Sequence, residues 1–157
     1  MPQRREDNLQ NNKLVTFKRI LVVCVGNICR SPVALALFRD KVNQVEFDSA
    51  GINAATGQPT APDSVKYAKA YGIELSSHSA KQLNSVLLKR HDLILVMEQE
   101  QINIITKKYP FTYGKVYLLG HWENKKEIYD PFGKVPEAHK KMVEEVYQSV
   151  TCWQKYL

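Results

Sequence analysis

Apolar residues along this chain form short continuous runs, separated by stretches in which they recur three or four positions apart. The runs predict buried strands within residues 17–23, 45–49, 92–97 and 115–119. The helical spacing, together with capping and stop residues, predicts helices at 32–42, 61–71, 84–89, 99–108 and 136–157. Because strands alternate with helices, the sequence predicts an α/β fold, a doubly wound, four-stranded parallel sheet of order 2-1-3-4 with helices on both faces.

The length and composition of the chain are those of one domain. With 157 residues and 44% hydrophobic content, it has enough apolar surface for a single core. Residues 1–13 are almost entirely polar and predict a disordered extension, which leaves residues 14–157 as the single domain. No apolar run approaches the length of a membrane span, so we expect a soluble, cytoplasmic protein without membrane insertion.

Charge and cysteine content narrow the classes of partner. Three cysteines, two of them in one loop, do not make the framework of a secreted disulfide-rich protein and fit a reducing compartment. The formal net charge of +6 favours anionic partners, but no basic stripe interleaved with stacking aromatics predicts a nucleic-acid partner. His91, His121 and His139 lack metal-ligand spacing to a second His or Cys, so no metal site is predicted. The oligomeric state is left open.

The loop from Cys24 to Ser31 follows the first apolar run and precedes a predicted helix. At such a junction the N–H groups of the loop and the positive end of the helix dipole converge on an anion. Cys24 stands at the mouth of this electropositive loop, a setting that favours a reactive thiolate. The loop therefore predicts a phosphate site with a cysteine nucleophile.

Other residues of this loop complete the predicted site. Arg30 offers a planar fork for two phosphoryl oxygens. Gly26 and Asn27 tolerate the left-handed turn of a tight anion site, and the Ser31 hydroxyl is suited to donate a hydrogen bond to the thiolate. Pro32 suits the first position of the following helix. We expect the loop to bind phosphate through Val25, Gly26, Asn27, Ile28, Cys29 and Arg30.

Hydrolysis of a phosphate ester by a thiol also needs a proton donor for the leaving group. Asp130, before Pro131 in the last long loop, is placed to reach the ends of the strands and is the predicted general acid. An Asp-Pro pair also starts turns, and the turn alone is the favoured interpretation in a chain that lacks Cys24.

The stretch CVGNICRSP, residues 24–32, resembles the signature loop of the low-molecular-weight protein tyrosine phosphatases. The resemblance covers nearly all of residues 18–157. It implies hydrolysis of phosphotyrosine through a cysteinyl-phosphate intermediate, without cofactor or metal, with Cys24, Arg30 and Asp130 as catalytic residues. The family carries its general acid in an Asp-Pro-aromatic motif, which in this chain is Asp130-Pro131-Phe132.

Two polar residues outside the loop are predicted to support it. Ser49 ends the second strand, within reach of Asn27 or a loop carbonyl. His78 matches a motif of the resembled family that holds the asparagine of the signature loop. Residues 50–57 contain no aromatic residue, unlike the eukaryotic branch of the family, so Ile52 and Phe132 are the expected walls of the substrate pocket.

Residues 114–124 resemble a bacterial branch of this family, which acts beside the tyrosine autokinases of capsule and exopolysaccharide export. The resemblance implies that the substrate is a phosphotyrosine protein, the tyrosine-rich tail of such a membrane kinase. A tail with several phosphotyrosines suits a shallow pocket, because multiple weak contacts raise the effective concentration. The identity of the kinase, the host and the polysaccharide is left open.

Cys29 has two interpretations. It is either a thiol that forms a disulfide with Cys24 and protects it from irreversible oxidation, or a small buried residue.

Three alternatives for the whole protein are disfavoured by single features of the sequence. An arsenate reductase of this fold needs an additional cysteine pair, and the chain has none between Arg30 and Thr151. A phosphoarginine phosphatase typically carries Thr where Ile28 stands, and the apolar Ile28 favours a flat aromatic leaving group. A non-catalytic reader of phosphotyrosine has no use for a proton donor such as Asp130.

Overall fold

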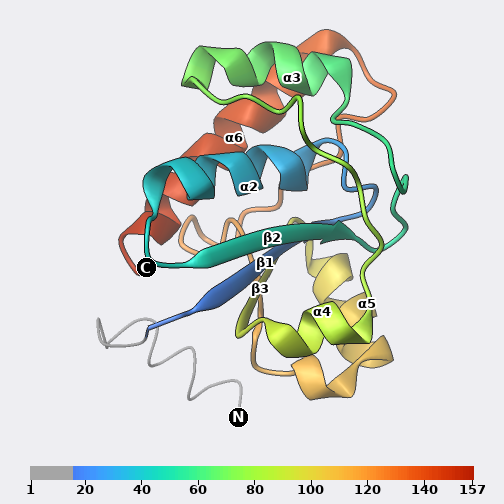
Figure 1. Cartoon of the computed structure of the whole chain (residues 1–157), viewed down its shortest axis with the longest axis vertical. Coiled ribbons are helices and arrows are strands. Elements are labelled where there is room, and N and C mark those ends of the chain that lie inside the picture. The colour runs from blue at the N-terminus through green and yellow to red at the C-terminus, as the bar shows by residue number, and fades with distance from the viewer. Residues whose placement is uncertain (1–15) are drawn as a thin grey trace.

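The computed structural model describes residues 16–157, and the predicted disordered extension at 1–13 lies outside the described residues. A parallel sheet with strand order β2-β1-β3-β4 runs through the centre of the domain (Figure 1). Its strands are β1 (Arg19–Cys24), β2 (Glu46–Gly51), β3 (Leu93–Val96) and β4 (Val116–Leu118). The predicted fold class and strand order are confirmed.

The register of the sheet brings the carboxyl ends of β1, β2 and β3 side by side. In the parallel pairing of β1 with β2, Arg19 lies opposite Glu46 and Cys24 lies opposite Gly51. β1 also pairs with β3, where Val23 lies opposite Val96. Because all four strands run in the same direction, the residues that follow Cys24, Gly51 and Val96 gather at one end of the sheet.

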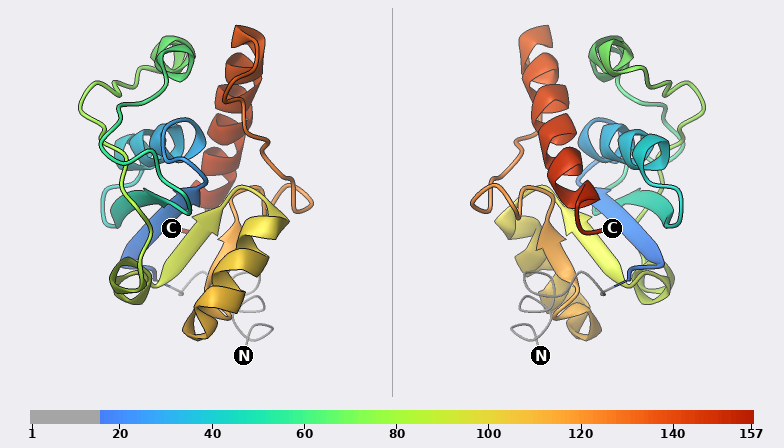
Figure 2. Two further views of the ribbon diagram at one scale, coloured as in Figure 1. Left: turned by 90° about the vertical axis from the view of Figure 1, so that its right-hand side faces the viewer. Right: turned by 90° about the vertical axis from the view of Figure 1, so that its left-hand side faces the viewer.

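Helices cover both faces of the sheet, as the alternation of strands and helices predicts. α2, α3 and α6 lie on one side and α4 and α5 on the other (Figures 1 and 2). The helices are α2 (Arg30–Lys41), α3 (Pro62–Ala68), α4 (Ser85–Arg90), α5 (Gln99–Lys108) and α6 (Pro136–Gln154), with short 3₁₀ turns η1 (Lys69–Tyr71) and η2 (Pro110–Thr112).

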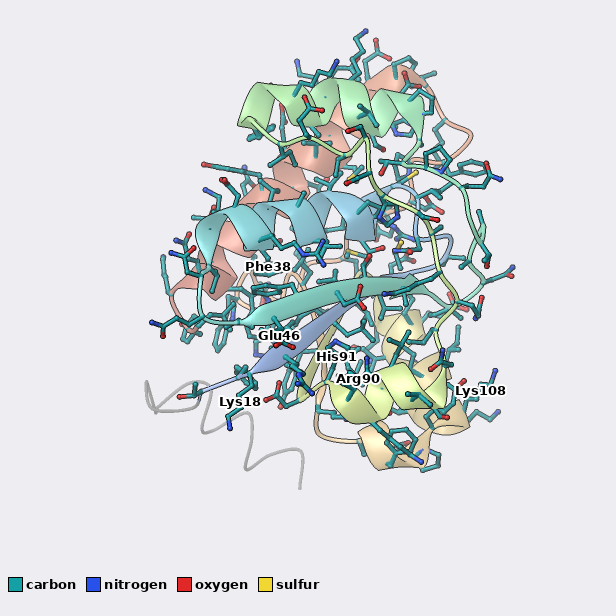
Figure 3. All side chains as sticks on the ribbon, in the orientation of Figure 1. Lys18, Phe38, Glu46, Arg90, His91 and Lys108 are labelled. Atoms are coloured by element: carbon teal, nitrogen blue, oxygen red, sulfur yellow. The ribbon has the colours of Figure 1, made fainter. Side chains whose placement is uncertain are left out.

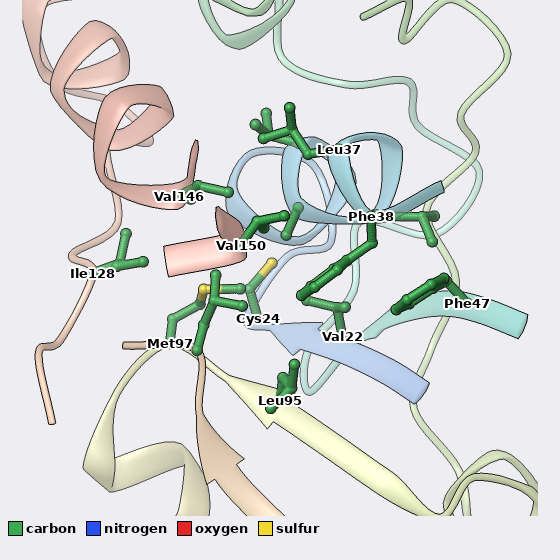
Figure 4. Packing of buried hydrophobic residues seen from close by; sticks show 14 of the residues in the cluster. Val22, Cys24, Leu37, Phe38, Phe47, Leu95, Met97, Ile128, Val146 and Val150 are labelled. Atoms are coloured by element: carbon green, nitrogen blue, oxygen red, sulfur yellow. The ribbon is translucent and has the colours of Figure 1, made fainter. Parts of the chain in front are cut away.

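Alternate residues of β1 enter two separate cores. Ile20, Val22 and Cys24 pack in the cluster under α2 and α6, whereas Leu21 and Val23 pack in the cluster on the side of α4 and α5. Figure 4 shows the first cluster, in which side chains from the strands meet those of α2 and α6 around Cys24. Since successive side chains of a strand point to opposite faces, a strand covered on both faces is apolar throughout.

The start of α2 differs from the sequence prediction. The predicted helix begins at Pro32, but in the structure it begins at Arg30, which makes Pro32 the third helical residue. The first helical positions have no intrahelical acceptor for their N–H groups, so proline is tolerated throughout this turn and does not fix the first residue. As a result Arg30 and Ser31 belong to the first turn of the helix.

The last helix closes the first core against the end of β4. Trp153 is fully buried, and its Nε1 donates a hydrogen bond to the carbonyl of Leu119 at 2.8 Å. Trp122 stacks on Tyr156 with ring centroids 3.8 Å apart. Over residues 16–157, none of the helices is both long and apolar enough to span a bilayer.

Candidate active site

The loop between β1 and α2 surrounds the sulfur of Cys24. The Cys24 Sγ lies 3.0 Å from the Ser31 Oγ, and the backbone N–H of Asn27 donates to the same sulfur at 3.3 Å. Asn27 has a φ of 60°, in the left-handed region that the sequence predicts for this turn. The thiol is therefore placed where two hydrogen-bond donors from its own loop reach it.

The side chain of Asn27 sets the direction of these hydrogen bonds. Its Nδ2 donates to the Ser31 Oγ at 2.8 Å and to the Ser49 Oγ at 3.0 Å. Both amide hydrogens are then used, and Ser31, which accepts one of them, has its own hydrogen left for Cys24. Ser31 can therefore donate to the sulfur, which is the direction that a thiolate requires.

Two residues of the segment between α3 and α4 form hydrogen bonds with Asn27. The His78 Nε2 lies 2.7 Å from the Asn27 carbonyl oxygen, and the Lys81 N–H donates to Asn27 Oδ1 at 3.0 Å. Because a carbonyl only accepts, the Nε2 of His78 carries the hydrogen. Burial lowers the pKa of His78 below its ordinary value of 6.5. The structure thus brings Ser49 and His78 to the loop at Asn27.

The guanidinium of Arg30 is buried at the first position of α2 and has partners from two distant segments. Its Nη1 donates to Glu98 Oε1 at 2.5 Å and to the Ile128 carbonyl at 2.8 Å. Its Nη2 lies 3.8 Å from Asp130 Oδ2. The Nε of Arg30 is buried and has no hydrogen-bond partner among the described residues. Arg30 lines the same cavity as Cys24, and a buried donor without a partner suits an anion there, because leaving such a group unpaired is costly.

Asp130 stands at the opening of the site. Its side chain is 43% exposed, and its Oδ1 accepts a hydrogen bond from the Phe132 N–H at 3.1 Å. Phe132 is largely exposed. Asp130 and Arg30 are 100 positions apart in sequence but adjacent here, because the loop before α6 returns over the ends of the strands.

A cavity of about 210 Å³ joins these residues. Its lining comes from the β1–α2 loop, the β2–α3 loop and the loop before α6 that carries Asp130. The lining residues are Cys24, Val25, Gly26, Ile28, Cys29, Arg30, Asn53, Ala55, Asp130 and Phe132. Ser31, Ser49 and His78 do not line the cavity, but each forms a hydrogen bond with Asn27 of the loop.

Ile52, the other expected wall residue, is not in this lining. Its backbone N–H donates to the Cys24 carbonyl at 2.9 Å, and its side chain packs against the core cluster on the side of α4 and α5. The next residue, Asn53, and then Ala55 face the cavity instead. An apolar side chain at the edge of a core is drawn into it, and the neighbouring position then faces the pocket.

Cys29 lines the same cavity but has different surroundings. Burial raises the pKa of the Cys29 thiol to about 12, while a hydrogen bond with Ser64 acts in the opposite direction. Cys24, Cys29 and Cys152 are all free thiols in the structure. Over residues 16–157, no group of three or more His, Cys, Asp or Glu side chains is arranged to hold a metal ion.

Sequence reasoning missed two charged residues of the site. Glu98 pairs with Arg30, and Lys81 pairs with Asp48 beside the backbone N–H that holds Asn27. Glu98 directly follows Met97 at the end of the strand next to β1, and polar residues at that end of a parallel sheet face the ligand site. This position was the available signal for Glu98, whereas nothing local indicates Lys81.

Fold and site together define an α/β protein that presents a cysteine, an arginine and an aspartate around the loop between β1 and α2. Comparison with known proteins then identifies the family. The family described as low molecular weight phosphotyrosine protein phosphatase matches residues 19–157. The chain belongs to this family, and it is an enzyme, a protein-tyrosine phosphatase.

Individual relatives match over almost their whole length. A probable low molecular weight protein-tyrosine phosphatase, EpsP of Ralstonia nicotianae, is 43% identical over 137 residues, which cover 87% of this chain and 94% of the relative. The structure of Vibrio vulnificus Wzb in complex with benzylphosphonate is 35% identical with a TM-score of 0.87, covering 90% of this chain and all of that one. The YwlE arginine phosphatase of Geobacillus stearothermophilus is also similar, 31% identical with a TM-score of 0.82, covering 87% of this chain and 90% of that one.

Proposed function

We propose that this phosphatase works through a cysteinyl-phosphate intermediate on Cys24. The observation that carries the proposal is the hydrogen bonding of the Cys24 sulfur, which lies 3.0 Å from the Ser31 hydroxyl oxygen and 3.3 Å from the Asn27 nitrogen, whose N–H donates to it. Both donors stabilise a thiolate, which is the nucleophilic form of cysteine.

In the first step the thiolate attacks phosphorus and the bond from phosphorus to the tyrosyl oxygen breaks. Asp130 transfers its proton to that oxygen, so tyrosine leaves as a neutral phenol. The guanidinium of Arg30 and the N–H groups of the loop bind the remaining phosphoryl oxygens.

In the second step water attacks the cysteinyl phosphate. Asp130, now a carboxylate, takes a proton from the water, the bond from sulfur to phosphorus breaks, and inorganic phosphate leaves with the thiolate restored. One carboxyl group thus serves both steps, and its position at the rim of the cavity is accessible to both the leaving group and water.

The substrate that we propose is phosphotyrosine on the tail of a bacterial tyrosine autokinase of capsule or exopolysaccharide export, met in the cytoplasm. Ile28 and Phe132 give the cavity apolar surface for an aromatic ring, and the similar Wzb of Vibrio vulnificus binds benzylphosphonate. Beyond Asn53 and Ala55 the β2–α3 loop adds no aromatic wall, so selectivity depends on contacts outside the pocket.

The similarity to an arginine phosphatase makes phosphoarginine the second candidate substrate. Guanidine is a charged, hydrogen-bonding group that an apolar side chain does not satisfy. Ile28 lines the cavity in this chain and therefore favours the tyrosyl ring.

The mechanism is tested with an aryl phosphate and three variants. Cys24→Ser should abolish turnover while still binding substrate, and Asp130→Asn should lower kcat by roughly 10²- to 10⁴-fold, the range for loss of a general acid. Cys152→Ser, a cysteine in α6 outside the cavity, is the matched control and should keep the wild-type rate. Turnover by Cys24→Ser contradicts the intermediate.

The substrate is tested separately. Cys24→Ser protein should retain a phosphotyrosine-bearing autokinase from an extract of cytoplasm and membranes, and wild-type enzyme should release phosphate from that kinase faster than from phosphoarginine proteins. Retention of phosphoarginine proteins alone would reverse the choice of substrate and leave the mechanism intact.

A further inference from the structure

The end of the sheet remote from the cavity carries a cluster of basic and aromatic side chains. We define this basic face by Lys18, Lys89, Arg90, Lys108, Lys115, Phe111 and Tyr113. Tyr113 ends the η2 turn that contains Phe111, and the Lys115 Nζ donates to the Leu88 and His91 carbonyls. Figure 3 shows Lys18 and Arg90 on the lower side of the domain, near the starts of the strands, and Lys108 farther along that side. A shallow depression of about 610 Å³, lined mainly by polar and charged residues, lies among them.

Among residues 16–157, few acidic groups balance this charge. Of the two carboxylates in the depression, Glu46 pairs with Arg19 at 2.8 Å. Asp92 accepts hydrogen bonds from the backbone N–H groups of Lys18 and Arg19, at 3.0 and 3.1 Å. Neither carboxylate forms an ion pair with the Lys89 or Arg90 side chain, so the positive charge of α4 faces solvent.

The aromatic residues are held among these lysines. The ammonium groups of Lys89 and Lys115 lie 5.3 and 5.7 Å from the centre of the Phe111 ring, and that of Lys108 lies 5.5 Å from the Tyr109 ring. Phe111 is 44% exposed and Tyr113 is 64% exposed.

An aliphatic side chain extends this surface. Val86 is 62% exposed and precedes Lys89 by three positions on α4, which places both on one side of the helix. The basic face therefore combines positive charge with exposed apolar side chains.

We propose that the basic face binds the surface of an anionic phospholipid membrane. Lysine and arginine are attracted to anionic headgroups, and neighbouring aromatic and aliphatic side chains insert at the boundary between headgroups and acyl chains. Two other anionic partners fit less well. A nucleic acid needs free ring faces for stacking, but cations lie over the rings of Phe111 and Tyr109, and an acidic peptide leaves Val86 and Tyr113 without apolar contacts.

The position of the face gives this binding a consequence for catalysis. The basic face lies at the starts of parallel strands and the cavity at their ends, so a bound molecule keeps its cavity away from the lipid. Binding holds the enzyme at the membrane and raises its concentration near substrates anchored there. The inference does not depend on the proposed substrate, since lipid binding occurs without turnover.

Flotation of the full-length protein with lipid vesicles tests the proposal. Wild-type protein should bind vesicles of phosphatidylcholine with about one third phosphatidylglycerol and should not bind phosphatidylcholine alone. The double variant Lys89→Glu/Arg90→Glu should lose affinity by about tenfold or more, because two attractions become repulsions. Tyr113→Ser should weaken binding by about threefold at physiological salt, where apolar insertion contributes most.

The matched control is Lys140→Glu/Lys141→Glu, the same change of charge at exposed positions near the start of α6. It should change affinity by less than about threefold. Hydrolysis of an aryl phosphate in solution reports folding of every variant. If Lys89→Glu/Arg90→Glu does not fold, Lys18→Glu/Lys108→Glu replaces it.

Three results would overturn the proposal. The first is equal binding to vesicles with and without phosphatidylglycerol, and the second is an equal loss of affinity in the variant and its control. The third is binding to polyglutamate or to DNA that exceeds binding to the anionic vesicles, which would assign the face to an acidic protein or a nucleic acid.

Discussion

Cys24 and Cys29 lie in one loop and line one cavity, but their chemical surroundings differ. Cys24 receives hydrogen bonds from its loop, whereas burial raises the pKa of Cys29 to about 12. At neutral pH Cys29 is therefore almost entirely a thiol, the form that reacts poorly with oxidants and disulfides. This difference suits Cys24 to catalysis, whereas Cys29 stays protonated and unreactive at neutral pH.

We predict that Cys29 protects Cys24 after oxidation, at a rate that depends on pH. Peroxide converts Cys24 to a sulfenic acid. The Cys29 thiolate then attacks the Cys24 sulfur, the S–O bond breaks, and the hydroxide that leaves takes a proton from solvent; reductant reopens the resulting disulfide. Because the Cys29 pKa is about 12, the rate of disulfide formation should rise about tenfold per pH unit between about pH 7 and 9.

The measurement is recovery of activity by dithiothreitol after peroxide, in wild type and Cys29→Ser. The wild type should recover more, and its advantage should grow with pH, since a higher pH populates the Cys29 thiolate. The same recovery in both proteins at every pH would return Cys29 to the role of a small buried residue.

At the scale of elements, the junction of β3 and α5 fixes the arginine of the site. Gln101, in the first turn of α5, accepts hydrogen bonds through its Oε1 from the N–H groups of Met97 and Glu98, at 2.8 and 3.2 Å. This arrangement closes the turn between strand and helix and directs the Glu98 carboxylate to Arg30. Arg30 is thus held by the β3–α5 junction, which lies 68 positions from it in the sequence.

We predict that Glu98→Gln lowers kcat/KM for an aryl phosphate by roughly 10- to 100-fold, because Arg30 loses a charged partner and its fork is no longer fixed. The guanidinium is buried, so removal of the charge should also lower the free energy of unfolding by about 1–3 kcal/mol.

Glu100→Gln is the control, the same chemical change at an exposed position of the same turn. It should leave both quantities near the wild-type values. Steady-state kinetics and urea unfolding measure the two effects, and a Glu98→Gln enzyme as active as the control would show that Ile128 and Asp130 suffice to orient Arg30.

For the molecule as a whole, the burial of His78 beside the loop makes stability depend on pH, and its hydrogen bond to Asn27 acts in the opposite direction. Burial lowers the His78 pKa in the folded state, while the unfolded chain has the ordinary value of 6.5. Below that value the unfolded state binds more protons than the folded state, so the free energy of unfolding falls as pH falls. Above about pH 7.5 histidine is neutral in both states and contributes no slope.

We predict that this slope is absent in His78→Gln, whose amide retains a donor for the Asn27 carbonyl but does not titrate in this range. Between about pH 7.5 and 5, wild-type stability should therefore decline more steeply than that of the variant. Urea unfolding at a series of pH values measures both curves. Parallel curves would mean that His78 keeps its ordinary affinity for protons in the folded protein.

The sequence by itself determined the order of the elements and the family. Strand and helix signals are local, and the predicted helix at 99–108 coincides with α5. The residues of the loop from Cys24 to Ser31 are contiguous, so their chemistry was visible before their geometry.

Tertiary structure decided which residues meet across the sheet. Glu98 reaches Arg30 from 68 positions away, and Ile128 from 98, contacts that exist only because parallel strands end side by side. Tertiary packing also directs the Ile52 side chain towards the core on the side of α4 and α5, and it places Asn53 at the cavity. A pattern of side-chain types does not specify such positions, because they depend on which packing buries the most apolar surface.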